Sequence, residues 1–140
     1  MKELSAELRK AQEYENKALK EENENKFPVF HLKVPTGWMN DPNGFSVYKG
    51  EYHLFFQYNP YSRDWGSMHW GHVKSQDLIR WEYLPAALAP DQQYDKEGCF
   101  SGTALVVDDT LLLMYTGHRD IDGQIKQVQC LAKSTDGIHF

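Results

Sequence analysis

The sequence predicts an all-β protein made of two copies of a four-stranded unit, with one α-helix in front of them. Residues 2–25 contain neither Pro nor Gly and are rich in Glu, Lys and Asn, which indicates the helix. From Phe45 onward, short runs of Val, Tyr, Phe, Leu and Thr alternate with Gly, Asn and Asp, which indicates strands and hairpins. Residues 45–81 recur as residues 104–140 without a gap. A repeated four-stranded antiparallel unit is typical of β-propeller blades.

The N-terminal segment, residues 1–26, is expected to be a helical extension that packs on the sheets. Its apolar stripe at helical spacing consists of Leu4, Leu8, Ala11 and Ala18. The charged residues between them are interpreted as a solvated face rather than a binding surface. The chemistry is therefore expected in residues 27–140.

The two copies are offset by a constant number of residues. Ser75 and Asp77 of the first copy recur as Ser134 and Asp136 of the second. Each copy is expected to contain a short strand, a hairpin turn, a very apolar strand, a polar connection, a third strand, and a Ser-x-Asp turn into a fourth. The same register is therefore predicted in both units.

The hairpin turns are predicted at Lys49-Gly50 and Asp108-Asp109. Phe140 takes the place of Trp81 at the start of a fourth strand, so the second unit is expected to be incomplete. Propellers close with about four to eight blades. Two blades alone are expected to leave an apolar face of the second unit without a neighbour.

The most distinctive motif is Trp38-Met39-Asn40-Asp41-Pro42-Asn43-Gly44. Pro42 fixes its own φ and disfavours the helical region for Asp41, while Asn43-Gly44 tolerates positive φ. The motif is predicted to be a turn that holds the Asp41 carboxylate rigidly. A plain surface turn would also explain Asp-Pro-Asn-Gly, but the adjacent indole and amide favour a site that binds a sugar.

The composition of the chain excludes several classes of binding partner. A net charge of −5 and a pI near 5.6, with no basic cluster among aromatics, argue against nucleic acid and anionic membranes as partners. No run of 18 apolar residues and no secretory signal are present, so neither a membrane span nor export is expected. Cys99 and Cys130 lack metal-type spacing and are expected to be buried free thiols in a reducing cytoplasm.

Five ordered motifs closely resemble glycoside hydrolase family 32, which contains the β-fructofuranosidases: invertases, sucrose-6-phosphate hydrolases, inulinases and levanases. The motifs are Trp38–Gly44, Phe55–Pro60, Trp70–Trp81, Cys99–Ala104 and Tyr115–Gly117. The resemblance runs from about Phe27 to Phe140. The segment from Asp91-Gln92 through Cys99-Phe100 is most similar to the bacterial sucrose-6-phosphate hydrolases.

The resemblance implies a five-bladed propeller followed by a β-sandwich, with a funnel-shaped site at the propeller axis and no metal or organic cofactor. It implies retaining hydrolysis of sucrose, sucrose 6-phosphate or a fructan end, with Asp41 matching the nucleophile that forms a fructosyl-enzyme intermediate. The positions that match the fructosyl subsite are Trp38, Met39, Asn40, Gln57, Trp65, Phe100 and Ser101.

Some of these residues have simpler explanations. Gln57 could mark the end of a strand, and Trp65 could belong to the core, although its loop-like surroundings favour a site wall. Ser101 has no Gly-x-Ser-x-Gly around it and is not expected to be a nucleophile. His69 and His72 are expected on opposite faces of one strand, which makes them a poor metal pair.

The family's Arg-Asp-Pro and Glu-Cys motifs, which carry the transition-state-stabilising Asp and the acid/base Glu, do not occur in the 140 residues. Arg119-Asp120 is interpreted as part of a turn, and Glu82 has no supporting motif. Two hypotheses remain. The chain is the N-terminal part of a β-fructofuranosidase, or it is a non-catalytic truncated product that is at most a weak fructoside-binding or interaction module. By itself the chain is predicted to be inactive.

Overall fold

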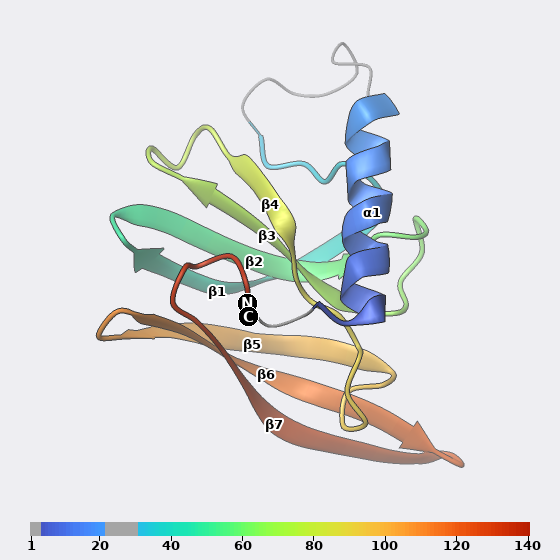
Figure 1. The fold of residues 1–140 in the computed structure, drawn as a ribbon. Helices are drawn as coiled ribbons and strands as arrows, with labels where there is room; N and C mark the ends of the chain where they lie inside the picture. Colours follow the sequence, from blue (N-terminus) through green and yellow to red (C-terminus); the bar gives the residue numbers. More distant parts are fainter. Residues whose placement is uncertain (1–3, 22–30) are drawn as a thin grey trace.

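The computed structural model describes residues 4–21 and 31–140, in which one helix precedes seven strands (Figure 1). The elements are α1 (Ala6–Glu21), β1 (Trp38–Tyr48), β2 (Glu51–Asn59), β3 (His69–Ser75), β4 (Glu82–Leu88), β5 (Gly98–Val107), β6 (Thr110–Ile121) and β7 (Gln124–Ser134). The strands form two antiparallel sheets with the orders β1-β2-β3-β4 and β5-β6-β7. The predicted fold class, all-β with an N-terminal helix, is confirmed.

The second and third strands of each sheet pair in the same register. Tyr52 lies opposite Ser75 in the first sheet, and Leu111 lies opposite Ser134 in the second. These pairs are related by the offset of the sequence repeat. One structural unit therefore occurs twice, as predicted.

The Ser-x-Asp turns are also the same in both units. The Ser75 hydroxyl donates to Asp77 Oδ1 at 3.2 Å, and the Ser134 hydroxyl donates to Asp136 Oδ1 at 2.8 Å. The same aspartate oxygens accept backbone N–H bonds from two later residues of each turn. These bonds satisfy backbone donors at the end of the third strand.

The predicted hairpin turns are confirmed. Lys49 and Gly50 both have positive φ, 50° and 80°, which matches the twist of the flanking strands in a two-residue turn. Asp108 also has a positive φ of 51°. In the described part of the chain the second sheet has three strands, and Phe140 packs edge-on against Phe55 at a centroid distance of 5.7 Å.

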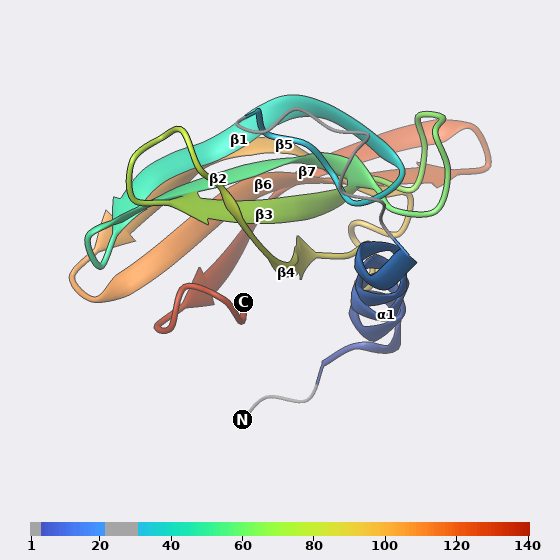
Figure 2. The same cartoon turned by 90° about the horizontal axis from the view of Figure 1, so that it is seen from above.

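The two sheets pack face to face, one above the other in Figure 1 and overlapping in Figure 2. The buried residues between them are Tyr48, Phe55, Trp70, Ala87, Leu88, Cys99, Leu111, Leu113 and Tyr115. Burying a large apolar side chain stabilises a fold by about 1.5–3 kcal/mol. This shared core fixes the position of one sheet relative to the other.

Part of the opposite face of the second sheet is apolar and exposed. Its exposed apolar residues are Leu105, Val107, Met114, Ile125 and Leu131. Along β6 they alternate with the buried Leu111, Leu113 and Tyr115, as strand geometry requires. The expectation that the second unit exposes an apolar face is confirmed for the described residues.

Helix α1 lies beside β4 (Figures 1 and 2). The Ser5 hydroxyl accepts the Leu8 N–H at 3.1 Å and caps the helix. The helix begins at Ala6, later than the predicted start at residue 2. Leu8 and Ala11 of the predicted stripe are buried against Ala86 and Ala89. The predicted boundary at residue 26 lies outside the described residues.

One charged residue of the helix is not solvated, contrary to the expectation. Glu15 lies on the apolar stripe, is 8% exposed, and accepts the Ala86 N–H at 3.1 Å. Gln12 donates to the Ala86 carbonyl at 3.1 Å, so the helix satisfies the backbone N–H and C=O of one residue on the edge strand β4. Burial raises the pKa of Glu15 to about 7.

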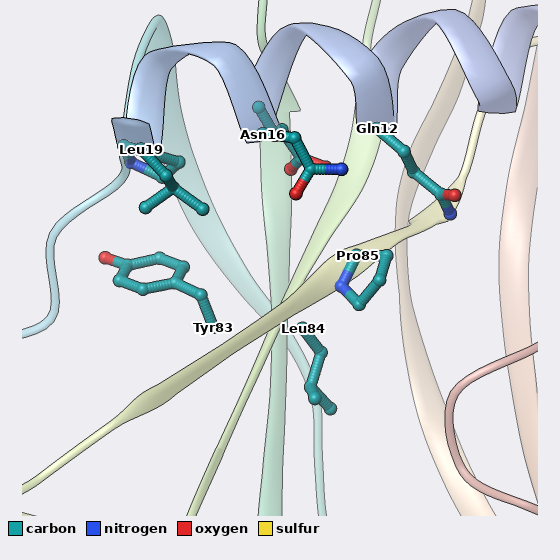
Figure 3. Close-up of a pocket in the computed structure, with 8 residues that line it drawn as sticks. Gln12, Asn16, Leu19, Tyr83, Leu84 and Pro85 are labelled. Atoms are coloured by element: carbon teal, nitrogen blue, oxygen red, sulfur yellow. The ribbon is translucent and has the colours of Figure 1, made fainter. Parts of the chain in front are cut away.

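Figure 3 shows the small cavity that remains between α1 and β4, with Gln12, Asn16 and Leu19 of the helix opposite Tyr83, Leu84 and Pro85 of the strand. Its volume is about 90 Å³. Within residues 4–21 and 31–140, no helix has the length and hydropathy needed to cross a bilayer.

Candidate active site

The Trp38–Gly44 motif lies within strand β1, not in a turn as predicted. Register shifts against β2 occur between Asn40 and Pro42 and again between Asn43 and Ser46. Asp41 has a φ of 23°. Irregularities of the β-bulge type absorb the residues that cannot pair, and Pro42 is tolerated because β1 is an edge strand. The local conformation that suggested a turn therefore bends a strand and redirects Asp41.

Asp41 contacts the second sheet directly. The Ser101 hydroxyl on β5 donates to Asp41 Oδ2 at 2.8 Å. Beside it, the Gly102 N–H donates to Asn43 Oδ1 at 3.1 Å. β5 also has a register shift, between Phe100 and Gly102, so the bulged parts of two strands meet here.

Gly44 permits this close approach. Its φ is 53°, and a Cβ atom there would lie 2.9 Å from Phe55 Cδ2 and 3.1 Å from Ala104 Cβ. A residue with a side chain would have to push β5 away from β1. The glycine thus allows the Asp41–Ser101 hydrogen bond to form between sheets.

A cavity of about 390 Å³ opens at this junction. It is lined by Asn40, Asp41, Gln57, Trp65, Phe100, Ser101, Thr116 and Gln127. Six of the eight residues predicted for the site are therefore brought together from β1, β2, β5 and a loop. Trp38 and Met39 are not among the lining residues. The Trp38 indole donates to Asn40 Oδ1 at 2.7 Å, and Met39 is 38% exposed.

Gln57 does not mark the end of its strand, because β2 continues to Asn59. Its side chain is 3% exposed, and its amide donates to the Cys99 carbonyl on β5 at 2.9 Å. This bond orients the Gln57 side chain at the cavity. It also ties the first sheet to the second.

Aromatic rings form one side of the cavity. Trp65 is 60% exposed, in the loop between β2 and β3, so it is not a core residue. Its ring lies 6.1 Å from that of Phe100 at 67°. Phe100 in turn stacks on His118 at 4.2 Å and 9°. Such faces suit the apolar surface of a sugar.

Sequence reasoning missed Thr116 and Gln127. Gln129 donates to Thr116 Oγ1 at 3.1 Å, and the Gln127 amide lies 3.2 Å from His118 Nδ1. The repeat offered a signal, because Gln127 and Gln129 take the places of the buried Met68 and Trp70 of the first unit. Because these positions are buried and apolar in the first unit but polar in the second, the second unit does not pack there in the way the first unit does.

His53 on β2 and His69 and His72 on β3 are not among the residues that line the cavity. His53 Nδ1 lies 2.9 Å from His72 Nε2, and His72 stacks on Phe55 at 4.1 Å. Burial lowers the pKa of both rings and that of His69. Within residues 4–21 and 31–140, no three His, Cys, Asp or Glu side chains are grouped as metal ligands.

The other charged candidates also lie elsewhere. Arg119-Asp120 belongs to the end of β6, not to the predicted turn, and Arg119 pairs with Glu97 at 3.3 Å. Glu82 begins β4 and pairs with Lys74 at 3.6 Å. The regular pairing of β6 with β7 continues to Ile121, so β6 extends beyond the end that the repeat with the first unit predicted for it.

Both cysteines are free thiols, as predicted. Cys99 is buried, but Cys130 is only partly buried, contrary to the expectation. Cys130 lies on β7, which has no strand on its outer side among the described residues. Its exposure follows from this edge position.

Residues 31–140 match the Glycosyl hydrolases family 32 N-terminal domain. The chain belongs to glycoside hydrolase family 32. The family 32 N-terminal domain is a propeller, so the two packed sheets are propeller blades, as the repeat predicted.

Known family 32 proteins resemble the chain over most of its length. It is 56% identical over 118 residues to a sucrose-6-phosphate hydrolase of Zymomonas mobilis, covering 81% of this chain and 23% of that protein. A mutant of a β-fructofuranosidase of Bombyx mori, in complex with sucrose, has a TM-score of 0.84 and 46% identity, covering 98% of this chain and 29% of that one. A sucrose-6-phosphate hydrolase of Lactobacillus gasseri has a TM-score of 0.77 and 37% identity, covering 97% and 27%. The chain thus spans about a quarter of these family 32 proteins.

Proposed function

We propose that this chain supplies the nucleophile and the fructosyl-binding wall of a β-fructofuranosidase active site. The substrate class is sucrose, sucrose 6-phosphate or the terminal unit of a fructan. One observation carries the proposal: the Asp41 carboxylate lies in a cavity lined by amide, hydroxyl and aromatic side chains and accepts a hydrogen bond from Ser101 of the neighbouring blade. The similarity to a protein in complex with sucrose supports it.

In the proposed reaction, Asp41 attacks the anomeric C2 of a fructofuranosyl unit and forms a fructosyl-enzyme ester, while the bond from C2 to the leaving-group oxygen breaks. Ser101 engages Oδ2, so Oδ1 is proposed to be the oxygen that attacks the anomeric carbon. Retention needs a second carboxyl about 5–5.5 Å away, first to protonate the leaving group and then to deprotonate water. That acid/base and the transition-state-stabilising Asp are proposed to come from the Arg-Asp-Pro and Glu-Cys motifs, which these 140 residues do not contain.

The lining residues suit a neutral sugar. Asn40 and Gln57 can both donate to and accept from ring hydroxyls, and Trp65 and Phe100 can cover an apolar sugar face. Asp41 is the one charged residue among those that line the cavity in the described part of the chain. A phosphate on the substrate would therefore be bound by residues outside this set. Trp38 is proposed to support Asn40 through the indole hydrogen bond, and Met39 to lie at the rim.

Two further assignments are proposed with this function. Residues 1–26 form a helical extension and residues 27–140 form part of the propeller domain, which the family match over residues 31–140 supports. A cytoplasmic location is proposed because both cysteines are free.

The test is the Asp41→Asn variant in the full-length gene product, assayed for release of fructose from sucrose. Loss of the nucleophile is expected to lower kcat by at least about 10⁴-fold. The first fructose released by the unmodified protein is expected to be the β-anomer, as observed by NMR within seconds of mixing. Inversion at C2, or an active Asp41→Asn variant, contradicts the assignment.

The 140-residue chain assayed alone is expected to be inactive on sucrose, since loss of the acid/base group by itself costs about 10²–10⁴ in rate. Release of fructose that disappears with Asp41→Ala would show the opposite. A full-length product that binds fructosides but hydrolyses none would support the non-catalytic alternative.

A further inference from the structure

The outer face of the second sheet changes character along its strands. One end carries the exposed apolar residues Leu105, Met114 and Leu131. The other end, beside Phe100, carries the polar residues Thr116, His118, Gln127 and Gln129, with the exposed Ile125 beyond them. They share one face because Thr116 pairs with Gln129 and His118 pairs with Gln127. A surface made only to pack against another blade would be apolar throughout. The polar end, which opens into the Asp41 cavity, has a different neighbour.

The hydrogen bonds at this polar end orient two groups toward the cavity. Thr116 Oγ1 accepts from the Gln129 amide, which leaves the Thr116 O–H free to donate in another direction. The Gln127 amide nitrogen faces His118 Nδ1, which leaves Gln127 Oε1 as an acceptor. His118 itself is held by stacking on Phe100. The cavity wall thus presents one oriented donor and one oriented acceptor.

A pair of sugar hydroxyls is complementary to this arrangement, because one hydroxyl can accept from Thr116 while another donates to Gln127. Both residues lie to one side of the reacting centre. Ser101, the partner of Asp41, is on β5, and Gln127 is on β7, two strands away. Two strand spacings are about 10 Å. A furanose ring attached at Asp41 does not reach Gln127, but the next sugar of the substrate does, and Thr116 lies on the strand between the two, opposite Phe100.

We propose that Thr116 and Gln127 bind the leaving-group sugar of the substrate and thereby set specificity for it, with Gln129 and His118 as positioning residues. This inference rests on the proposed fructofuranosidase function. It concerns the part of the substrate that departs, whereas Asn40, Gln57 and Ser101 lie on the side of the fructosyl unit.

The test compares two substrates that share the fructosyl unit: sucrose and methyl β-D-fructofuranoside, whose leaving group is methanol. In the full-length gene product, Gln127→Leu is expected to lower kcat/KM for sucrose by about 5- to 15-fold, the effect of one lost hydrogen bond. The value for the methyl fructoside is expected to stay within about twofold, because that substrate has no second sugar. Thr116→Val is expected to act in the same way, and Thr116→Ser to retain the sucrose rate.

The matched control is Gln124→Leu, the same substitution at the exposed start of β7. This variant is expected to leave kcat/KM unchanged for both substrates. The proposal is overturned if Gln127→Leu lowers kcat/KM equally for both substrates, since the residue would then act on the fructosyl unit or on the fold. The proposal is also overturned if the ratio of the kcat/KM values for the two substrates is the same in Gln127→Leu as in the unmodified protein. If the unmodified protein hydrolyses neither substrate, both this inference and the proposed function fail, whereas an unchanged ratio with active protein removes only this inference.

Discussion

The hydroxyl of Ser101 and the carboxylate of Asp41 form a 2.8 Å hydrogen bond between two sheets, although the residues are 60 positions apart in the chain. Each residue lies at an irregular point of its strand. The orientation of the candidate nucleophile therefore depends on how the two blades dock.

Removing the Ser101 hydroxyl is expected to impair the reaction more than substrate binding. In Ser101→Ala, Asp41 loses the bond that orients it, so kcat for sucrose is expected to fall by about 10- to 100-fold, as for hydrogen bonds to charged groups. Steady-state kinetics of the full-length product provide the measurement. Thr103→Ala, two residues along β5, is the control and should leave kcat unchanged; equal effects of the two variants would disprove a specific role for Ser101.

Gly44→Ala is expected to destabilise the fold strongly. Alanine at a φ of 53° costs about 1–2 kcal/mol, and its Cβ would collide with Phe55 and Ala104. Gly50→Ala is a matched control, because Gly50 also has positive φ, 80°, but a Cβ there meets nothing within 4 Å. Urea denaturation should place Gly44→Ala below Gly50→Ala in free energy of unfolding. A smaller loss for Gly44→Ala would show that the close approach of β1 and β5 is not required.

Glu15 is expected to make the free energy of unfolding depend on pH. Burial raises its pKa from 4.5 to about 7 in the folded protein, so the folded state binds a proton more firmly than the unfolded state does. Its contribution is fully present below about pH 4.5 and is lost as pH rises through about 7. The full effect is on the order of 3 kcal/mol.

The measurement is urea denaturation from pH 5 to 8, with Glu15→Gln to remove the titration while keeping an acceptor for the Ala86 N–H. The difference between the two proteins should grow with pH and favour Glu15→Gln above pH 7. The buried His53 and His72 oppose folding as pH falls, but they are common to both proteins and cancel in the difference. Glu13→Gln, at an exposed position of the same helix, should show no such difference. A pH-independent difference for Glu15→Gln would contradict the assignment.

The exposed apolar face of the second sheet is expected to make the 140-residue chain self-associate when it is studied alone. Met114 and Leu131 lie directly opposite each other on this face and are 44% and 62% exposed. The double variant Met114→Lys, Leu131→Glu should shift the chain toward the monomer in sedimentation velocity, since it replaces the apolar pair by a charge pair. Lys126→Glu on β7 serves as a charge-changing control. Unchanged association in the double variant would place the contact elsewhere.

The sequence determined the repeated unit. The spacing of apolar residues and the recurrence of Ser75 and Asp77 as Ser134 and Asp136 predicted the hairpins and the register, because strand alternation and turn chemistry depend on residues close together in the chain. The motifs also predicted six of the residues that meet at the cavity, whereas Trp38 and Met39, which were predicted with them, do not line it. Asn40, Asp41, Gln57, Trp65, Phe100 and Ser101 all line it.

Only the tertiary structure decided how these residues are held. Asp-Pro-Asn-Gly has the local preferences of a turn, but pairing with β2 on one side and contact with β5 on the other keep it within a strand and bulge it. Glu15 has the polarity of a solvated residue, but the packing of α1 against β4 buries it, and the Ala86 N–H on that strand donates to it. Thr116 and Gln127 join the cavity because the two sheets pack together. The repeat marked Gln127 as polar where the first unit is apolar, but it did not place either residue beside Asp41. Conformations set by neighbouring residues could thus be predicted, whereas those set by partners far along the chain required the packed structure.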